Sequence, residues 1–171
     1  MRNLITYEEI GLLARPCTTD RDMAEAMIAE AQRVEIKSRL GDALYIALTS
    51  DTPEARFSVL LEGGVWECGG RTAGLLTGIK TALAYYALAR IIRDGNIQAT
   101  TYGAAIKDDQ YSQDPEKTER QRQYRELFSQ ADAYMAEALR YLAQNRETFP
   151  EFQACRKRMR NNRMTIRVIG K

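Results

Sequence analysis

The sequence predicts a mainly α-helical protein: an elongated helical bundle with a projecting extended arm or hairpin and an extended C-terminal tail. Residues 74–92 form an apolar-rich run whose only charged residues are Lys80 and Arg90. Residues 115–144 repeat apolar side chains at helical spacing, and at 1.5 Å per residue such a helix extends over about 45 Å. With 44% hydrophobic and 28% charged residues in 171, the composition fits a globular domain.

The chain divides into two regions by charge. We expect residues 1–150 to form one helical domain, from which residues of about 97–113 project as an arm. Residues 151–171 hold seven basic residues and one acidic residue, so they carry about +6 of a whole-chain charge of +2 and leave about −4 on the rest. The protein is therefore predicted to be a mildly acidic body with a basic C-terminal tail.

The N-terminal helix is predicted from its cap. Thr6 followed by Glu9 matches a capping box, in which the hydroxyl and the carboxylate each accept a hydrogen bond from a free backbone amide. This helix should extend to about Ala14, because Pro16 cannot continue it.

The second helix should begin after the cluster Thr18-Thr19-Asp20 and reach Leu40. Gly41 then marks a break or bend. The apolar positions that recur at helical spacing along this helix are Met23, Met27, Ala31 and Val34.

A third and a fourth helical segment are predicted before the central apolar run. Leu44, Tyr45 and Leu48 form a short apolar stripe that ends near Asp51. Pro53 is suited to be the first residue of a segment that extends to Leu61, which Gly63 and Gly64 close.

Residues 63–70 are expected to be a loop that turns the chain between helices, with Trp66 covering apolar surface. The glycines of this loop invite comparison with a phosphate-binding loop. Gly70 and Arg71 occupy the positions that would need lysine and then serine or threonine, and no apolar strand leads into the loop. A nucleotide-binding function is therefore disfavoured.

The apolar run is predicted to be a helix over Thr72–Arg93, buried around most of its circumference within a bundle or between subunits. A membrane span is disfavoured because Lys80, with no partner in reach, would be costly near the bilayer centre. Tyr85 and Tyr86 are expected to be buried with hydrogen-bonded hydroxyls rather than to form a stacking platform.

After Asp94-Gly95-Asn96 ends this helix, residues 97–112 contain β-favouring side chains and no helical period, so an extended arm or hairpin is predicted. Asp114 and Pro115 then start a long helix to about Gln144. A last alternating run, residues 164–169, has the pattern of a strand without a partner of its own, which is a template for joining another chain.

Enzymatic chemistry is disfavoured. The chain has no histidine, which removes the commonest general base and zinc ligand. Asp108 and Asp109 are more consistent with solvated carboxylates than with a metal site. Cys17, Cys68 and Cys155 form no CxxC pair, which suggests a reducing, cytoplasmic compartment. We expect no catalytic residue, no cofactor and no metal site.

The basic tail has three interpretations: it contacts nucleic-acid phosphates, it docks on an acidic partner surface, or it is a solvated terminus.

Several segments together resemble a family. The opening ITYEEIGLLARP, the run EAQRVEIKSRLGDALYIAL, the LLEGG turn of Leu60–Gly64, the helix GIKTALAYYALARII and the arm TYGAAIKDDQYS look like those of head-to-tail connector proteins of tailed bacteriophages. These proteins are also called adaptors or head-completion proteins, and the similarity is greatest to versions from phages and prophages of gut Bacteroidetes. It covers about residues 5–169.

The resemblance implies a structural virion protein, made in the host cytoplasm and located in the virion neck. Twelve copies would form a ring beneath the portal, extend the DNA channel through which DNA passes without specific binding, and join a tail or further neck protein, with no membrane contact. The arm would contact the neighbouring subunit through Thr101, Tyr102, Ile106 and Tyr111. The tail would bind the portal or a neck protein through Arg156, Arg158, Arg160, Arg163, Thr165, Ile166, Arg167 and Val168.

The alternative from another class is a small helical nucleic-acid-binding protein, such as a terminase small subunit or regulator, which would use the basic tail. No helix-turn-helix with a basic recognition helix is recognisable in the sequence.

Overall fold

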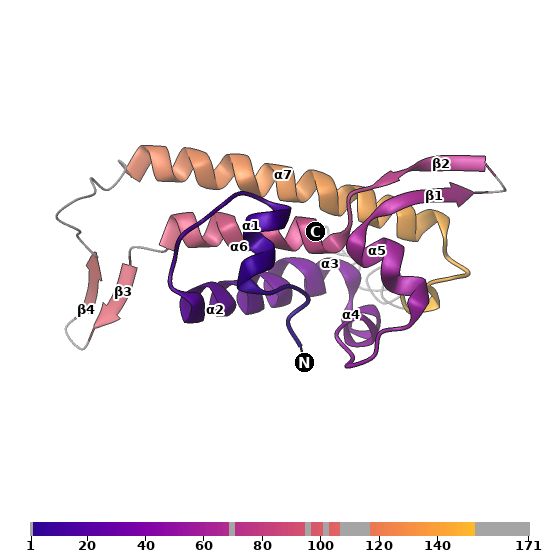
Figure 1. Cartoon of the computed structure of the whole chain (residues 1–171), viewed down its shortest axis with the longest axis horizontal. Coiled ribbons are helices and arrows are strands. Elements are labelled where there is room, and N and C mark those ends of the chain that lie inside the picture. The colour runs from indigo at the N-terminus through magenta and orange to yellow at the C-terminus, as the bar shows by residue number, and fades with distance from the viewer. Residues whose placement is uncertain (1, 69–70, 95–96, 101–102, 107–116, 153–171) are drawn as a thin grey trace, which may run out of the picture.

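The computed structural model describes residues 2–68, 71–94, 97–100, 103–106 and 117–152 (Figure 1). The predicted tail contacts, from Arg156 to Val168, lie outside these residues, as do Thr101, Tyr102 and Tyr111 of the predicted arm.

The described part of the chain is mainly helical, as predicted. Its helices are α1 (Tyr7–Leu13), α2 (Arg21–Ala31), the π-helical turn η1 (Gln32–Ile36), α3 (Lys37–Leu40), α4 (Asp42–Leu48), the 3-10 turn η2 (Ala55–Phe57), α5 (Ser58–Glu62), α6 (Ile79–Asp94) and α7 (Lys117–Gln144). Two antiparallel hairpins complete it: β1 (Gly64–Cys68) with β2 (Arg71–Leu76), and β3 (Ile97–Thr100) with β4 (Gly103–Ile106).

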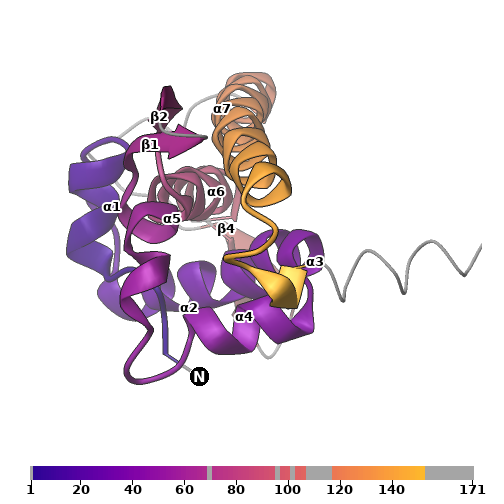
Figure 2. The same cartoon turned by 90° about the vertical axis from the view of Figure 1, so that its right-hand side faces the viewer.

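Two long antiparallel helices, α6 and α7, lie side by side along the molecule and make it elongated (Figure 1). Seen end-on, α6 occupies the centre, with α7, α1, α5 and α2 around it (Figure 2). Ten of the sixteen residues of α6 are buried, which confirms the prediction of a helix covered on most sides. None of the helices in the described ranges is long and apolar enough to cross a membrane.

The two hairpins lie at opposite ends of this helix pair (Figure 1). The β1–β2 hairpin lies beside the C-terminal end of α7, and the β3–β4 hairpin lies beyond the end of α6, close to where α7 begins. The arm predicted over residues 97–112 is therefore a hairpin over the part that the structure describes, with Ile97 paired to Ile106.

Both predicted N-terminal caps are present. The Thr6 amide donates to Glu9 Oε2 at 2.8 Å, and the Glu9 amide donates to the Thr6 hydroxyl at 3.4 Å, which completes the capping box. The Asp20 carboxylate accepts from the Met23 amide at 3.0 Å and caps α2. Gly41, with φ of 83°, makes the predicted break after Leu40.

The apolar stripe predicted for the second helix is correct only in part. Ala24 and Ile28 are buried together with the predicted Ala31, whereas Met23 and Met27 are only half-buried and Val34 is exposed. The π-helical turn rotates the positions that follow Ala31, which moves Val34 out of the predicted stripe. Gln32, four residues after the buried Ile28, is also buried: its side-chain oxygen accepts from the Leu4 amide at 2.7 Å, and its side-chain amide donates to the Tyr45 hydroxyl at 3.0 Å.

The loop predicted at residues 63–70 and the first turns predicted for the apolar helix are wrong. Residues 64–68 and 71–76 form the β1–β2 hairpin, and α6 begins only at Ile79. Gly78 precedes the first turn of α6 and has φ of 95°. Residues with a side chain rarely adopt this backbone conformation, so the position favours glycine. The segment predicted from Pro53 begins two residues later, as η2 at Ala55 with Glu54 as its N-cap.

Lys80 was expected to have no partner in reach, but the structure gives it two acidic partners. Its ammonium lies 2.6 Å from Glu62 and 3.5 Å from Glu9, so one cation links α6 to α5 and α1.

Candidate functional site

The β1–β2 hairpin is held by a close crossing of the backbone at its base. Gly63 and Gly78 both have positive φ, 89° and 95°. A Cβ on Gly63 would lie 2.5 Å from the Leu76 carbonyl oxygen, and a Cβ on Gly78 would lie 2.6 Å from the Gly63 nitrogen. The two glycines therefore let the chain enter and leave the hairpin at one point on the bundle.

The inner face of this hairpin is anchored by aromatic packing. Trp66 pairs with Gly74 across the hairpin, and the absence of a side chain at Gly74 leaves room for the indole, whose Nε1 would lie 3.2 Å from a Cβ there. The indole meets the Tyr141 ring of α7 edge-on, with centroids 5.3 Å apart. Tyr141 meets Phe149 in the same manner at 5.6 Å, so the hairpin joins the core.

The outer face carries an exposed apolar pair. Val65 and Leu75 are directly opposite each other in the strand register, and they are 63% and 74% exposed. Single exposed apolar residues are common, but two at facing positions make a continuous patch. We call Val65 and Leu75 the outer apolar pair.

The strands of this hairpin also have unpaired sides. The sheet consists of β1 and β2 alone within the described chain, so each strand presents one side without a strand partner. A two-stranded sheet is marginal by itself and is completed by a third strand or by packing. Glu67 of β1 is exposed and adds a negative charge beside the outer apolar pair.

The described chain ends close to this hairpin. Phe149 is buried and stacks on Phe57 with centroids 5.9 Å apart. Glu151 pairs with Arg56 at 2.6 Å, and Phe152 is buried. Since Phe149 also touches Tyr141, which contacts Trp66, only two aromatic contacts separate this end from the hairpin.

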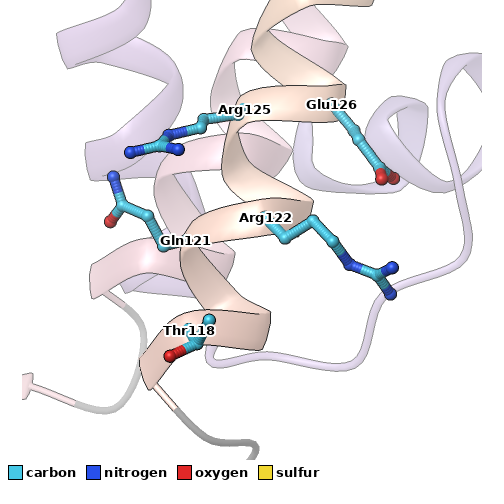
Figure 3. A pocket seen from close by; sticks show the side chains of 5 residues that line it. All are labelled: Thr118, Gln121, Arg122, Arg125 and Glu126. Carbon is cyan, nitrogen blue, oxygen red and sulfur yellow. The ribbon is translucent and has the colours of Figure 1, made fainter.

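The first turns of α7 line an open hollow at the opposite end (Figure 3). Thr118, Gln121, Arg122, Arg125 and Glu126 line it, and Figure 3 shows Arg125 and Arg122 pointing to different sides of the helix. Arg122 pairs with Glu119 at 2.8 Å, and this hydrogen bond lowers the pKa of Glu119 and raises the pKa of Arg122. Polar and charged side chains thus line the hollow, with two arginines against one glutamate.

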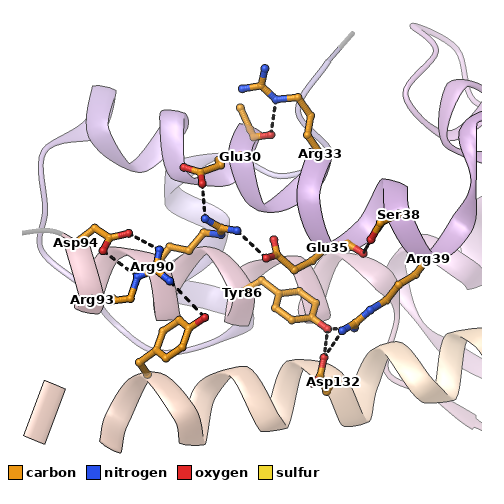
Figure 4. Close-up of polar contacts among 12 residues, drawn as sticks. Glu30, Arg33, Glu35, Ser38, Arg39, Tyr86, Arg90, Arg93, Asp94 and Asp132 are labelled. Carbon is orange, nitrogen blue, oxygen red and sulfur yellow. Dashed lines mark hydrogen bonds and ion pairs between the residues drawn. The ribbon is translucent and has the colours of Figure 1, made fainter. Parts of the chain in front are cut away.

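Between the two ends, an ion-pair network with a buried core joins α2, α6 and the π-helical turn (Figure 4). The Arg90 guanidinium donates to Glu35 at 2.6 Å and also pairs with Glu30, and the Arg90 and Glu35 side chains are each 8% exposed. Burial is the largest single effect on the pKa of Arg90 and lowers it. The hydrogen bond and charge of Glu35 and the charge of Glu30 together outweigh burial, so the pKa is raised.

Beside it, the Tyr86 hydroxyl donates to Asp132 and accepts from Arg39. Burial and the hydrogen bond to Asp132 raise the pKa of Tyr86. The prediction of a buried tyrosine with a bonded hydroxyl is confirmed for Tyr86, whereas Tyr85 is half-buried and packs edge-on against Tyr134.

Among the residues described, no group of three or more histidine, cysteine, aspartate or glutamate side chains is placed to hold a metal ion. Of the predicted site residues only Ile106 lies within the described chain, in β4, and the others lie outside it. Sequence reasoning missed the outer apolar pair, because only the strand register brings its two residues together.

Comparisons with known proteins give one result that bears on identity. No curated protein and no solved structure matches the chain. Residues 36–162 match the profile of DUF6712, described as a family of unknown function. The match extends from the end of the π-helical turn through both hairpins, α6 and α7, which is well over half of the chain, and the protein therefore belongs to the DUF6712 family.

Proposed function

We propose that the protein is a head-to-tail connector subunit of a tailed bacteriophage, a structural virion protein that forms a ring of twelve copies beneath the portal. The observation that carries this proposal is the placement of two different hairpins at opposite ends of a long helix pair (Figure 1). The resemblance of the sequence to such connectors supplies the class of assembly.

Two unlike ends favour contacts in which one surface meets a different surface on the next copy. Such heterologous contacts generate rings when the rotation closes. The outer apolar pair of β1–β2 supplies one patch that gains free energy from burial, and the β3–β4 hairpin supplies a projecting element at the far end. A two-fold dimer would instead require the same patch on both partners.

In this proposal the basic tail docks on the portal or an adjoining neck protein. Residues 164–169 add a strand to an exposed sheet edge, and the arginines from Arg156 to Arg163 pair with acidic groups beside it. The protein works in the virion neck, after synthesis in the host cytoplasm, and the ring continues the DNA channel towards the tail.

Mass measurement of intact particles tests the assembly. We expect the subunit in many copies per virion, consistent with a ring, in fractions that also hold the portal. A single copy per virion, or a two-fold dimer in the particle, would contradict the proposal.

One observation favours a nucleic-acid-binding function as the second candidate: the exposed arginines Arg122 and Arg125 at the start of α7. If phosphates bind there, the affinity for duplex DNA should fall steeply with salt, and Arg125→Gln should weaken binding uniformly across sequences. Arg146→Gln, at the other end of the molecule, is the matched control. A connector would show only weak, non-specific binding that neither substitution changes.

A further inference from the structure

We propose that the C-terminal segment of residues 164–169 adds to the β1–β2 hairpin of its own chain as a third strand, before any partner is present. This inference concerns the free subunit, and it stands apart from the proposed role in a virion.

Within the described chain, the β1–β2 hairpin has unpaired strand edges and an exposed apolar face, which a third strand would extend. Val65 and Leu75 are exposed side by side, and each strand has a side without a strand partner in the described chain. An added strand would place its own alternating side chains next to this pair, with Ile166 and Val168 on one face. Three strands with one apolar face are more stable than two.

The position where the described chain ends makes the contact possible. Phe149 and Glu151 fix this end against Phe57 and Arg56. Phe149 also packs against Tyr141, which packs on Trp66 of the hairpin. Eleven residues lie between Phe152 and residue 164, and at about 3.3 Å each they extend over about 36 Å. The hairpin itself is only about 20 Å long, so the segment reaches either strand.

Charge favours the same docking. Residues 151–171 carry about +6, whereas the rest of the chain carries about −4. Glu67, on the first strand of the hairpin, is exposed and negative, whereas Glu62 at its base is paired with Lys80. The basic residues that precede the segment therefore approach a body of opposite net charge, with Glu67 as an exposed carboxylate on the hairpin itself.

Disulfide trapping tests the proximity. In a full-length chain with Cys17, Cys68 and Cys155 replaced by serine, Ile166→Cys is combined with Val65→Cys to test the side of β1, or with Leu75→Cys to test the side of β2. We expect one of the two pairs to form a disulfide within a monomer under mild oxidation. The control pair is Ile166→Cys with Leu12→Cys, which is 83% exposed but lies on α1, and it should remain reduced.

A second measurement does not depend on strand register. Hydrogen exchange of the β1 and β2 amides is compared between the full chain and a chain that ends at Arg163. We expect exchange in the hairpin to become at least about tenfold faster on truncation, while α6 amides are unchanged. Circular dichroism confirms that the truncated chain retains its helices.

The outcomes separate the alternatives. A disulfide that joins two chains would assign the strand to a neighbouring copy and overturn docking within one chain. No disulfide with either pair, together with equal hairpin exchange in both chains, would overturn the inference altogether. Neither result bears on the copy number in virions, so the proposed function is tested independently.

Discussion

At the scale of single residues, we expect the largest loss of folding stability from a substitution in the buried pair of Arg90 and Glu35. Arg90→Met leaves the Glu35 carboxylate buried without its cation, and we expect a loss of about 3–5 kcal/mol in the free energy of unfolding. Urea denaturation followed by circular dichroism measures it. Arg21→Met is the matched control, because Arg21 and Glu8 are 66% and 56% exposed, and it should cost less than about 1 kcal/mol.

The same pair allows a double-substitution test. Arg90→Met combined with Glu35→Met removes both charges and fills the space with apolar side chains, so it should recover most of the stability lost in the single variant. A double variant as unstable as Arg90→Met alone would mean that packing, rather than the unpaired carboxylate, sets the cost.

Glu151 should make stability depend on pH. The hydrogen bond from Arg56 lowers the pKa of Glu151 below its ordinary value of 4.5. A carboxylate with a lowered folded-state pKa stabilises the fold above the ordinary value, and this stabilisation is lost as the pH falls through the lowered pKa. We therefore expect the stability of the parent protein to fall between about pH 5 and about pH 3 by more than that of Arg56→Gln. Urea midpoints across this range measure the difference.

At the scale of elements, the base of the β1–β2 hairpin depends on two glycines. Gly63→Ala or Gly78→Ala places a Cβ within 2.5–2.6 Å of backbone atoms in a conformation that L residues rarely adopt. Each should cost at least about 2 kcal/mol and weaken the packing of Trp66, the single tryptophan, whose fluorescence reports the change.

Gly11→Ala is the control for both variants. Gly11 lies within α1, and a Cβ there would meet nothing within 4 Å. This substitution should stabilise the protein by about 0.5–1 kcal/mol. If Gly11→Ala destabilised the protein as much as Gly63→Ala, the close backbone contacts at Gly63 and Gly78 would not be the cause of the loss.

Local signals predicted some elements well. The caps at Thr6 and Asp20, the break at Gly41 and the end of α7 at Gln144 depend on a few neighbouring residues, which is why they could be predicted. The β1–β2 hairpin could not be predicted from local signals, because its strands contain glycines. It is held by the contact of Trp66 with Tyr141, which is 75 residues away in sequence. The π-helical turn was missed for the same reason: its inward glutamate is matched by Arg90 of a distant helix.

The candidate site was harder to predict than the fold. The predicted contacts were placed in the arm and the tail, and all but Ile106 lie outside the described residues. The structure describes an exposed apolar pair, Val65 and Leu75. In the sequence these are two ordinary apolar residues on either side of a glycine-rich turn. Only the strand register brings them together.

At the scale of the whole molecule, the tail is expected to decide assembly onto the portal. Deletion from Arg163 onward should leave the helical fold intact, because α6 and α7 precede it, yet it should abolish binding to portal-bearing heads. Occupancy of purified heads, measured by quantitative mass spectrometry, is the test. Truncated protein that joins the heads at the parental level would contradict the docking role of the tail.

The tail and the outer apolar pair also link docking to ring closure. If residues 164–169 pair with an edge of the hairpin in the free subunit, that edge is closed to a neighbouring copy, and the subunit stays monomeric until a partner takes the strand. Truncation at Arg163 should therefore increase concentration-dependent self-association, measured by sedimentation velocity, because the strand edge beside Val65 and Leu75 is left unpaired. Adding Leu75→Glu to the truncated chain should reverse that association, whereas adding Leu12→Glu should not, since Leu12 is 83% exposed but lies on α1.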